Sequence, residues 1–385
     1  MTEPLRALIV TGTRADFGLW RPVIDEIGRR PAEIAASLLV TAMHLEPRFG
    51  HTIDEVRALG VPIAAEVACT PAGDSLADMA GALGTALEGM APAIAADRPD
   101  WLLLLGDRGE QLAAALAALH LGVPVAHLHG GEVTRGAVDD SLRDLVSRLA
   151  HLHLVANEAA AARLRGLGEE SWRIVITGAP GLDRLATEAG GDLEALRASH
   201  RLGTGRYLLV VQHPETVGGR SHLDDLDATL RAVTGSGLPA LAVMPNADAG
   251  GRAMADRLTA DPGLRSVASL PRGEYLTLLA GAAAVVGNSS SGIIEAPLLG
   301  VPAVNVGARQ AGRTRGDNVI DAPAQAEVIA EALRRALEPA FRRSLSRRSP
   351  YGDGHAAPRI VDALLTASRD QRLLAKRSGS EPAGG

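Results

Sequence analysis

The chain has 385 residues, and its 39 basic and 45 acidic side chains give a net charge of −6. This mild acidity argues against a protein that binds the phosphate backbone of nucleic acid. Aromatic residues make up 2% of the chain, so platforms for stacking bases are not expected either. The single cysteine, Cys69, excludes an intramolecular disulfide framework and a cysteine-rich zinc site.

No apolar run approaches the ~20 residues that span a membrane. The first six residues lack the pattern of a signal peptide. We therefore expect a soluble cytoplasmic protein with no membrane partner. The length is typical of two domains, and hydrophobic residues make up 46% of the sequence, which is enough to form their cores.

Short apolar segments rich in Val, Ile and Leu alternate with longer Ala/Leu/Arg segments of helical period. The predicted strands are 7–10, 37–40, 101–105, 123–126, 153–156 and 173–176, followed after a break by 207–211, 238–244, 284–287 and 301–306. The predicted helices include 19–30, 75–96, 110–120, 141–150 and 293–299. Near-continuous apolar strands separated by helices are typical of parallel sheets that are covered on both faces.

Two stretches about half a chain apart repeat one pattern. Residues 102–126 (LLLLGDRGEQLAAALAALHLGVPVA) and 284–304 (AVVGNSSSGIIEAPLLGVPAV) each contain an apolar strand, a Gly-polar turn, a helix and Leu-Gly-Val-Pro. Any unit of strand, helix and strand can end its helix with glycine and open the next strand near proline. The repeat nevertheless favours an α/β fold of two Rossmann-like domains that face each other across a cleft. We expect domains at 1–190 and 191–365, and a frayed tail at 366–385.

Polar residues follow nearly every predicted strand. They occur at 11–16, 43–44, 106–108 and 127–132 in the first half, and at 212–215, 245–248, 287–292 and 305–307 in the second. A single residue of this kind is usually a helix cap or a turn residue. In open α/β sheets, however, ligands bind outside the carboxyl ends of the strands. Two facing sheets would bring these clusters together, so we expect the functional site there.

The second half of the chain contains a candidate phosphate-binding turn. Residues 287–292 read Gly-Asn-Ser-Ser-Ser-Gly and precede a predicted helix, where hydroxyls and free N–H groups meet the positive end of the helix dipole. A serine cap requires only one of the three serines, so phosphate binding is favoured. Glu295 is either a surface acid or an acceptor for ribose hydroxyls. The three arginines of the loop 307–318 suit a diphosphate, although solvated side chains would give the same pattern.

His127 and His129 have the spacing of residues on one face of a strand, so their imidazoles could share a metal ion. Glu132 and Asp139 follow in the same Gly-rich segment. No third histidine follows at helical spacing, so acid–base or hydrogen-bonding roles are favoured over a metal site and over a purely structural role. We expect no metal and no cofactor. Asp107 and Asp139 also precede predicted helices and can cap them.

Seven segments, in order, resemble the hydrolysing UDP-N-acetylglucosamine 2-epimerases of sialic and nonulosonic acid biosynthesis. They lie within residues 7–320 and read TGTRADFGLWRPV, GDRGEQLAAA, HGGEVTRGAVDD, HPETV, PNADAGGR, GNSSSGIIEAPLLGVP and GARQAGRTRGDN. The resemblance implies a GT-B-like fold with the active site between its domains. It also implies a metal-free reaction on a nucleotide sugar, in which a base removes the C2 proton, UDP leaves from C1, and water adds to the resulting glycal. A homo-oligomer, either a dimer or a tetramer, is expected as well.

The strand-end clusters and the resemblance together give a set of expected site residues. Those expected to bind the nucleotide or the sugar are Arg14, His44, Arg108, Asn246, Leu270, Tyr275, Ser289, Ser290, Ser291, Glu295 and Arg309. Those expected to take part in the chemistry are Asp107, His129, Glu132, Asp139 and His213. By resemblance, Ser289, Ser290 and Arg309 hold the diphosphate, and Glu295 holds the ribose. Leu270 and Tyr275 are expected to flank the uracil.

One residue departs from the family pattern. Members of the sialic acid branch have an acidic residue where this chain has His129. An imidazole can still move a proton near neutral pH, but the identity of the C2 base is left open. The sugar is open too, either UDP-N-acetylglucosamine or a UDP- or GDP-linked 2,4-diacetamido-trideoxy sugar. The competing functions are a non-hydrolysing 2-epimerase, a GT-B glycosyltransferase and a non-catalytic nucleotide-sugar sensor.

Overall fold

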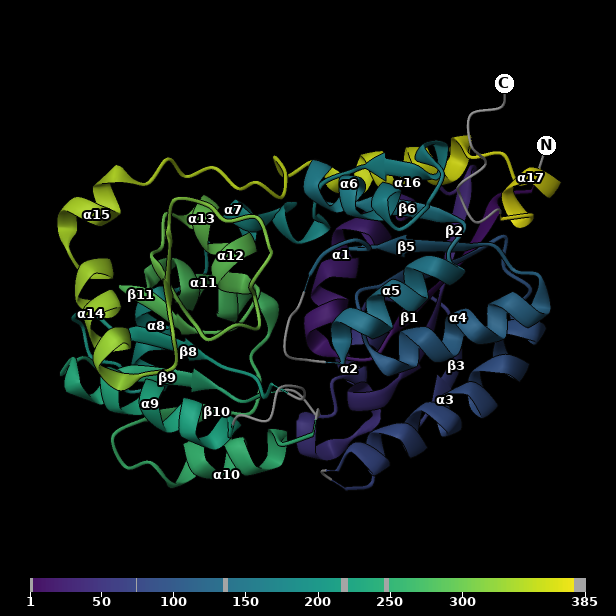
Figure 1. The fold of residues 1–385 in the computed structure, drawn as a ribbon. Coiled ribbons are helices and arrows are strands. Elements are labelled where there is room, and N and C mark those ends of the chain that lie inside the picture. The colour runs from purple at the N-terminus through teal and green to yellow at the C-terminus, as the bar shows by residue number, and fades with distance from the viewer. Residues whose placement is uncertain (1–2, 74, 134–137, 216–220, 246–248, 377–385) are drawn as a thin grey trace.

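The computed structural model of the chain describes residues 3–73, 75–133, 138–215, 221–245 and 249–376. These residues form two parallel sheets that lie side by side, each with helices on both faces (Figure 1). The expected α/β fold with two Rossmann-like domains is therefore confirmed. Within the described part of the chain, no helix has the length and hydropathy to cross a membrane.

The first sheet has seven parallel strands. Their order is β3 (Ile63–Val67), β2 (Ile34–Thr41), β1 (Leu5–Thr11), β4 (Trp101–Leu105), β5 (Val125–Leu128), β6 (Leu152–Val155) and β7 (Ile174–Ile176). Successive side chains of a strand point to opposite faces. Ala7 and Ile9 of β1 accordingly join the core beneath α1 (Arg14–Gly28), whereas Leu8 and Val10 join the core beneath α3 (Leu76–Asp97) and α4 (Gly109–Leu121).

The second sheet has six parallel strands, in the order β10 (Arg265–Val267), β9 (Ala240–Val243), β8 (Leu208–Val211), β11 (Ala284–Gly287), β12 (Ala303–Val306) and β13 (Val319–Ala322). Helices α9 (His222–Gly235) and α14 (Ala326–Ala336) cover one face. The other face is covered by α11 (Arg272–Gly281), α12 (Ser291–Ile294) and α13 (Ala296–Leu299).

The remaining helices are shorter or connect the sheets. They are α2 (Ile53–Arg57), α5 (Asp139–Leu149), α6 (Glu158–Gly166), α7 (Leu185–Glu188), α8 (Leu193–Ser199), α10 (Gly251–Ala260), α15 (Pro339–Ser344), α16 (Ala356–Thr366) and α17 (Gln371–Leu374). The described residues also form the 3₁₀ turns η1 (Ala42–Leu45), η2 (Pro47–Phe49), η3 (Ser171–Arg173) and η4 (Pro180–Leu182). The helix predicted at 293–299 is interrupted at Glu295, between α12 and α13.

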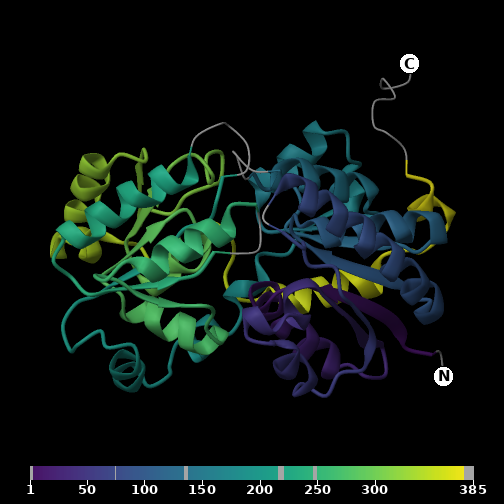
Figure 2. The same ribbon diagram turned by 90° about the horizontal axis from the view of Figure 1, so that it is seen from below.

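The end of the chain returns to the first domain. Ile360, Val361 and Leu364 of α16 are fully buried in the same core as α1, and Leu373 of α17 joins them. Figures 1 and 2 show these yellow helices beside the purple N-terminal elements. The expected second domain, 191–365, and frayed tail, 366–385, are corrected accordingly. Residues 356–373 belong to the first domain because the apolar side chains of α16 and Leu373 pack into the core beneath α1. Residues 377–385 lie outside the described residues.

Buried His127 anchors the turn that follows β4. Its Nε2 donates to the carbonyl oxygen of Gly106 at 2.7 Å, and its Nδ1 lies 3.0 Å from the hydroxyl of Ser147 on α5. The neutral ring satisfies both contacts, with one nitrogen as donor and the other as acceptor. His127 therefore ties β5 to α5 and to the turn that carries Asp107.

We expect His127 to make folding sensitive to acid. Burial lowers the pKa of His127 from about 6.5 to about 3, so only the unfolded chain gains a proton as the pH falls below 6.5. The stability that depends on the neutral ring is present above that pH and lost below it. When the pH is lowered from 7 to 5, the wild type should lose roughly 2 kcal/mol more of its free energy of unfolding than the His127→Asn variant loses. Parallel curves in urea titrations would contradict this role.

The returning helix gives a second expectation. Leu364→Ala should lower the free energy of unfolding by roughly 2–5 kcal/mol, because its side chain is fully buried. Leu374→Ala is the matched control, since Leu374 is 42% exposed, and it should cost less than about 1 kcal/mol. Equal effects of the two substitutions would mean that α16 is not part of the first core in solution.

Candidate active site

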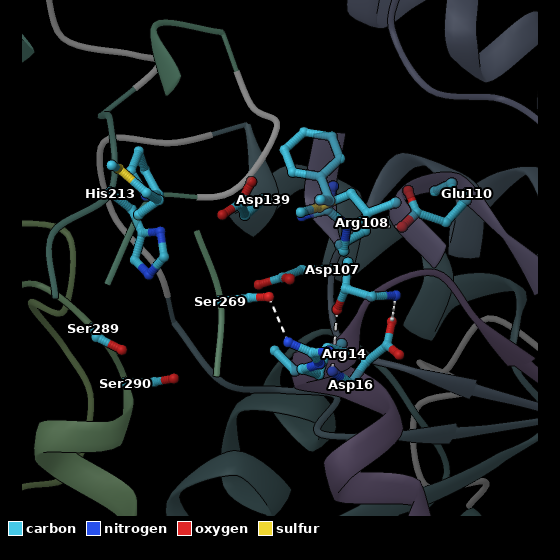
Figure 3. Close-up of a pocket in the computed structure, with 18 of the residues that line it drawn as sticks. Arg14, Asp16, Asp107, Arg108, Glu110, Asp139, His213, Ser269, Ser289 and Ser290 are labelled. Carbon is cyan, nitrogen blue, oxygen red and sulfur yellow. Dashed lines mark hydrogen bonds and ion pairs between the residues drawn. The ribbon is translucent and has the colours of Figure 1, made fainter. Parts of the chain in front are cut away.

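A cavity of about 420 Å³ lies at the carboxyl ends of both sheets and is lined by both domains. Most of the expected site residues line it, namely Arg14, Asp107, Arg108, Asp139, His213, Leu270, Tyr275, Ser289, Ser290, Ser291, Glu295 and Arg309. His44, His129 and Glu132 do not line it, and Asn246 lies outside the described residues. Figure 3 shows His213, Ser289 and Ser290 facing Asp107, Arg108 and Arg14 of the first domain.

Asp107 and Asp139 are both paired with arginines. Asp107 follows β4 and pairs with Arg143 of α5, whose guanidinium is almost wholly buried. Arg143 also donates to the carbonyl oxygen of Glu132 at 2.9 Å. Asp139 is the first residue of α5, and its Oδ2 accepts from Nη2 of Arg309 in the other domain at 3.1 Å. Helix α5 thus places one acid in the cavity and orients the other through Arg143.

The turn after β11 forms the second domain's side of the cavity. Gly287 has a φ of +132°, and a Cβ there would lie 2.1 Å from the carbonyl oxygen of Val211, so only glycine fits. Asn288 then bonds the backbone of His213 in both directions, at 2.7 and 2.9 Å, which holds the His213 segment beside the three serines. Arg309 donates to the Asn288 carbonyl at 3.3 Å. Three hydroxyls, a guanidinium and an imidazole therefore converge on the cavity.

His44 does not line the cavity, and its expected role in binding stays a prediction. Its Nε2 lies 3.0 Å from the hydroxyl of Thr11, and its Nδ1 lies 2.6 Å from that of Thr52. Burial, aided by the charge of Arg14, lowers the pKa of His44 to about 4. The neutral ring packs behind the cavity wall and contacts Thr52, which lines the cavity together with Arg14.

His129 and Glu132 do not line the cavity but take part in a buried contact between the domains. Their expected role in the chemistry stays a prediction. Nδ1 of His129 lies 2.6 Å from Oε1 of Glu132, whose Oε2 pairs with Arg313 of the second domain at 3.1 Å. Arg313 also donates to the carbonyl oxygen of Val133 at 2.8 Å. Burial alone would raise the pKa of Glu132, but Arg313 and His129 outweigh it and hold the pKa below its usual value.

Several lining residues were missed by the sequence reasoning. Asp16 caps α1 through the backbone N–H groups of residues 12 and 13, at 3.0 and 3.2 Å, and burial raises its pKa to about 6. Its place in the strand-end cluster 11–16 is the signal that could have found it. Ser269 accepts from Arg14 at 2.5 Å across the domains, and Arg272 also lines the cavity. Neither carries a local sequence signal.

A metal site receives no support from the clustering of side chains. Among the residues that the structure describes, no group of three or more His, Cys, Asp or Glu is arranged to hold a metal ion. His127 and His129, the candidate pair, are engaged with Gly106, Ser147 and Glu132 instead.

The sequence and the fold were compared with known proteins. The family described as UDP-N-acetylglucosamine 2-epimerase matches residues 25–365. A UDP-N,N'-diacetylbacillosamine 2-epimerase (hydrolyzing) from Legionella pneumophila is 36% identical, over 96% of this chain and 98% of that protein. A GDP/UDP-N,N'-diacetylbacillosamine 2-epimerase (hydrolyzing) from Campylobacter jejuni is 31% identical, over 81% and 83%.

The solved structures agree in fold. The UDP-GlcNAc 2-epimerase from Neisseria meningitidis, bound to UDP-GlcNAc, has a TM-score of 0.76 at 18% identity and covers 94% of this chain and 100% of that one. At this identity the likeness shows only the fold, which is GT-B-like. The sequence match, which extends over most of both chains, shows more: this protein belongs to the UDP-N-acetylglucosamine 2-epimerase family.

Proposed function

We propose that this chain is a hydrolysing 2-epimerase, which converts a UDP-linked 2-acetamido sugar to the free 2-epimeric sugar and UDP. One observation carries the proposal. Two aspartates of the first domain, Asp107 and Asp139, share a cavity with the hydroxyl and guanidinium groups of the second domain. Acid–base groups thus lie opposite groups suited to a departing diphosphate.

The reaction is an elimination followed by hydration. A carboxylate removes the proton at C2, the C–H electron pair forms the C1=C2 double bond, and the C1–O bond breaks so that UDP leaves with its electrons. Water then adds its oxygen to C1, and a proton is delivered to C2 from the opposite face. Asp107 and Asp139, which both line the cavity, are the acid–base candidates. Because the C2 proton is weakly acidic, stabilisation of the leaving diphosphate by Arg309 and the serines carries much of the first step.

Two observations support the hydrolysing outcome and the sugar. Both the L. pneumophila and C. jejuni relatives are named as hydrolysing enzymes of diacetylbacillosamine nucleotides. The first domain also contributes a largely apolar part of the cavity wall, formed by Met43, Phe49, Cys69, Pro71, Met79 and Leu83. Acetamido methyl groups and a 6-deoxy carbon suit apolar walls better than the hydroxyls of N-acetylglucosamine do. We therefore propose a UDP-linked 2,4-diacetamido-trideoxy sugar as the preferred substrate.

Product analysis tests the proposal. NMR of incubations with UDP-N-acetylglucosamine and with the UDP-linked 2,4-diacetamido-trideoxy sugar should show free 2-epimeric sugar and UDP, with faster turnover of the diacetamido substrate. In D₂O the product should carry deuterium at C2, because hydration delivers a solvent proton. An equilibrium mixture of nucleotide sugars would assign a non-hydrolysing enzyme instead, and full protium at C2 would contradict the elimination.

Substitution of the two acids tests their roles. Asp107→Asn and Asp139→Asn should each lower kcat by at least ~10²-fold. KM should change less than ~10-fold, because the other domain holds most of the diphosphate. Asp144→Asn is the control. Asp144 lies on α5, as Asp139 does, but it pairs with Arg163 at 2.8 Å and does not line the cavity. Steady-state kinetics that show equal losses in all three variants would indicate damage to α5 rather than loss of acid–base groups.

A further inference from the structure

Arg272, the first residue of α11, has partners in three places. Its Nε donates to Oε2 of Glu188 at 3.0 Å, and its Nη2 donates to the carbonyl oxygen of Gly181. Its Nη1 lies 3.7 Å from Oε1 of Glu295. Gly181 and Glu188 belong to η4 and α7, in the segment that connects the two sheets, whereas Glu295 lines the cavity. One guanidinium therefore joins the connecting segment to the site.

The stem of Arg272 also touches the first domain. A Cβ added at Gly18 of α1 would lie 2.6 Å from Cδ of Arg272. Any other residue at position 18 would push the arginine away from its partners. The side chain is 16% exposed, so it is held between α1, α7 and the cavity wall rather than moving freely in solvent.

Glu295 is a nearly buried carboxylate, with its side chain 8% exposed. Burial raises the pKa of Glu295, and the charge of Arg272 opposes that rise. A buried carboxylate needs a cation to remain charged. Arg272 supplies it from 3.7 Å, a distance that leaves the carboxylate oxygens able to accept other hydrogen bonds.

Helix α11 contacts both the serine turn and Glu295. Arg272 and Tyr275 are three residues apart on α11 and share a face, and the Tyr275 hydroxyl contacts Ser291 while Arg272 faces Glu295. Glu295 follows Ser290 by five residues, and both line the cavity. In a nucleoside diphosphate the ribose is bonded to the phosphates, so a phosphate held at the serines brings the ribose to the same part of the cavity. A carboxylate can accept from both hydroxyls of a vicinal diol at once.

We propose that Arg272 is a positioning residue for the nucleoside: it holds Glu295 toward the vicinal hydroxyls of a ribonucleoside diphosphate and fixes it to the segment that connects the domains. The inference rests on the proposed function, in which such a nucleotide occupies the cavity. A merely structural Arg272 would affect ribose and deoxyribose ligands equally. A positioning role acts through the ribose hydroxyls and therefore affects them differently.

Titration calorimetry with UDP and 2′-deoxy-UDP separates these cases. The wild type should prefer UDP by ~10-fold or more, the usual effect of a hydrogen bond to a charged group. Arg272→Met should weaken UDP binding by a similar factor and reduce the preference to about 1–2-fold. Arg257→Met is the matched control, because Arg257 also pairs with two acids, at 2.6 and 3.1 Å, but lies on α10 outside the cavity lining. It should keep the wild-type preference.

The outcomes are distinguishable. A wild type that binds neither nucleotide contradicts the proposed function itself. A wild type that binds both equally, or an Arg272→Met variant that keeps the wild-type preference, overturns the inference while leaving the proposed function intact. If Arg272→Met does not fold, as judged by its Tm, Arg272→Lys serves instead. A single ammonium cannot reach Gly181, Glu188 and Glu295 together, so its preference for UDP should also fall, and an unchanged preference overturns the inference.

Discussion

The ion pair between Asp139 and Arg309 joins the two domains across the cavity, with 3.1 Å between Oδ2 and Nη2. Both side chains are largely buried, with exposed fractions of 13% and 11%, and charges in such surroundings must be paired. The second cross-domain pair, Glu132 with Arg313, obeys the same constraint. The groups that are suited to a diphosphate and to a proton are therefore paired with one another. In the proposed reaction, the diphosphate competes with Asp139 for Arg309. Binding of the diphosphate therefore alters the pairing of Asp139, which is one of the two acid–base candidates.

The central strands could be predicted from the sequence because they are buried on both faces. Strands such as β4, with five buried residues, read as continuous apolar runs. The strands that were missed, β3, β10 and β13, are all edge strands that pair on one side only. Their side chains are partly exposed, so their sequences are mixed and carry no such run. The packing of α16 into the first core was also not predicted, because an apolar helical face does not specify which of two cores will bury it.

The position of the site could be predicted more fully than its contacts. The carboxyl ends of parallel strands meet at one edge, so any polar cluster there was a sound candidate. The side chain of a strand-end residue can nevertheless turn toward the cavity or away from it. His44 turns to Thr11 and Thr52, and His129 turns to Glu132. Ser269 and Arg272 were missed because their partners come from elsewhere in the chain, which no local pattern specifies.

The returning end of the chain supports the same helices that carry the first domain's site residues. Helix α16 packs against α1, whose first residue is Arg14. Beyond α17, the Lys376 ammonium donates to the carbonyl oxygens of Ser147 and Ala150 at 2.9 and 2.6 Å. These carbonyls close the C-terminus of α5, where a cation is favourable toward the helix dipole, and Asp139 begins that helix. Helices α1 and α5 thus present charged residues to the cavity at their N-terminal ends. The last described residues of the chain stabilise both helices by packing against α1 and by bonding the C-terminus of α5.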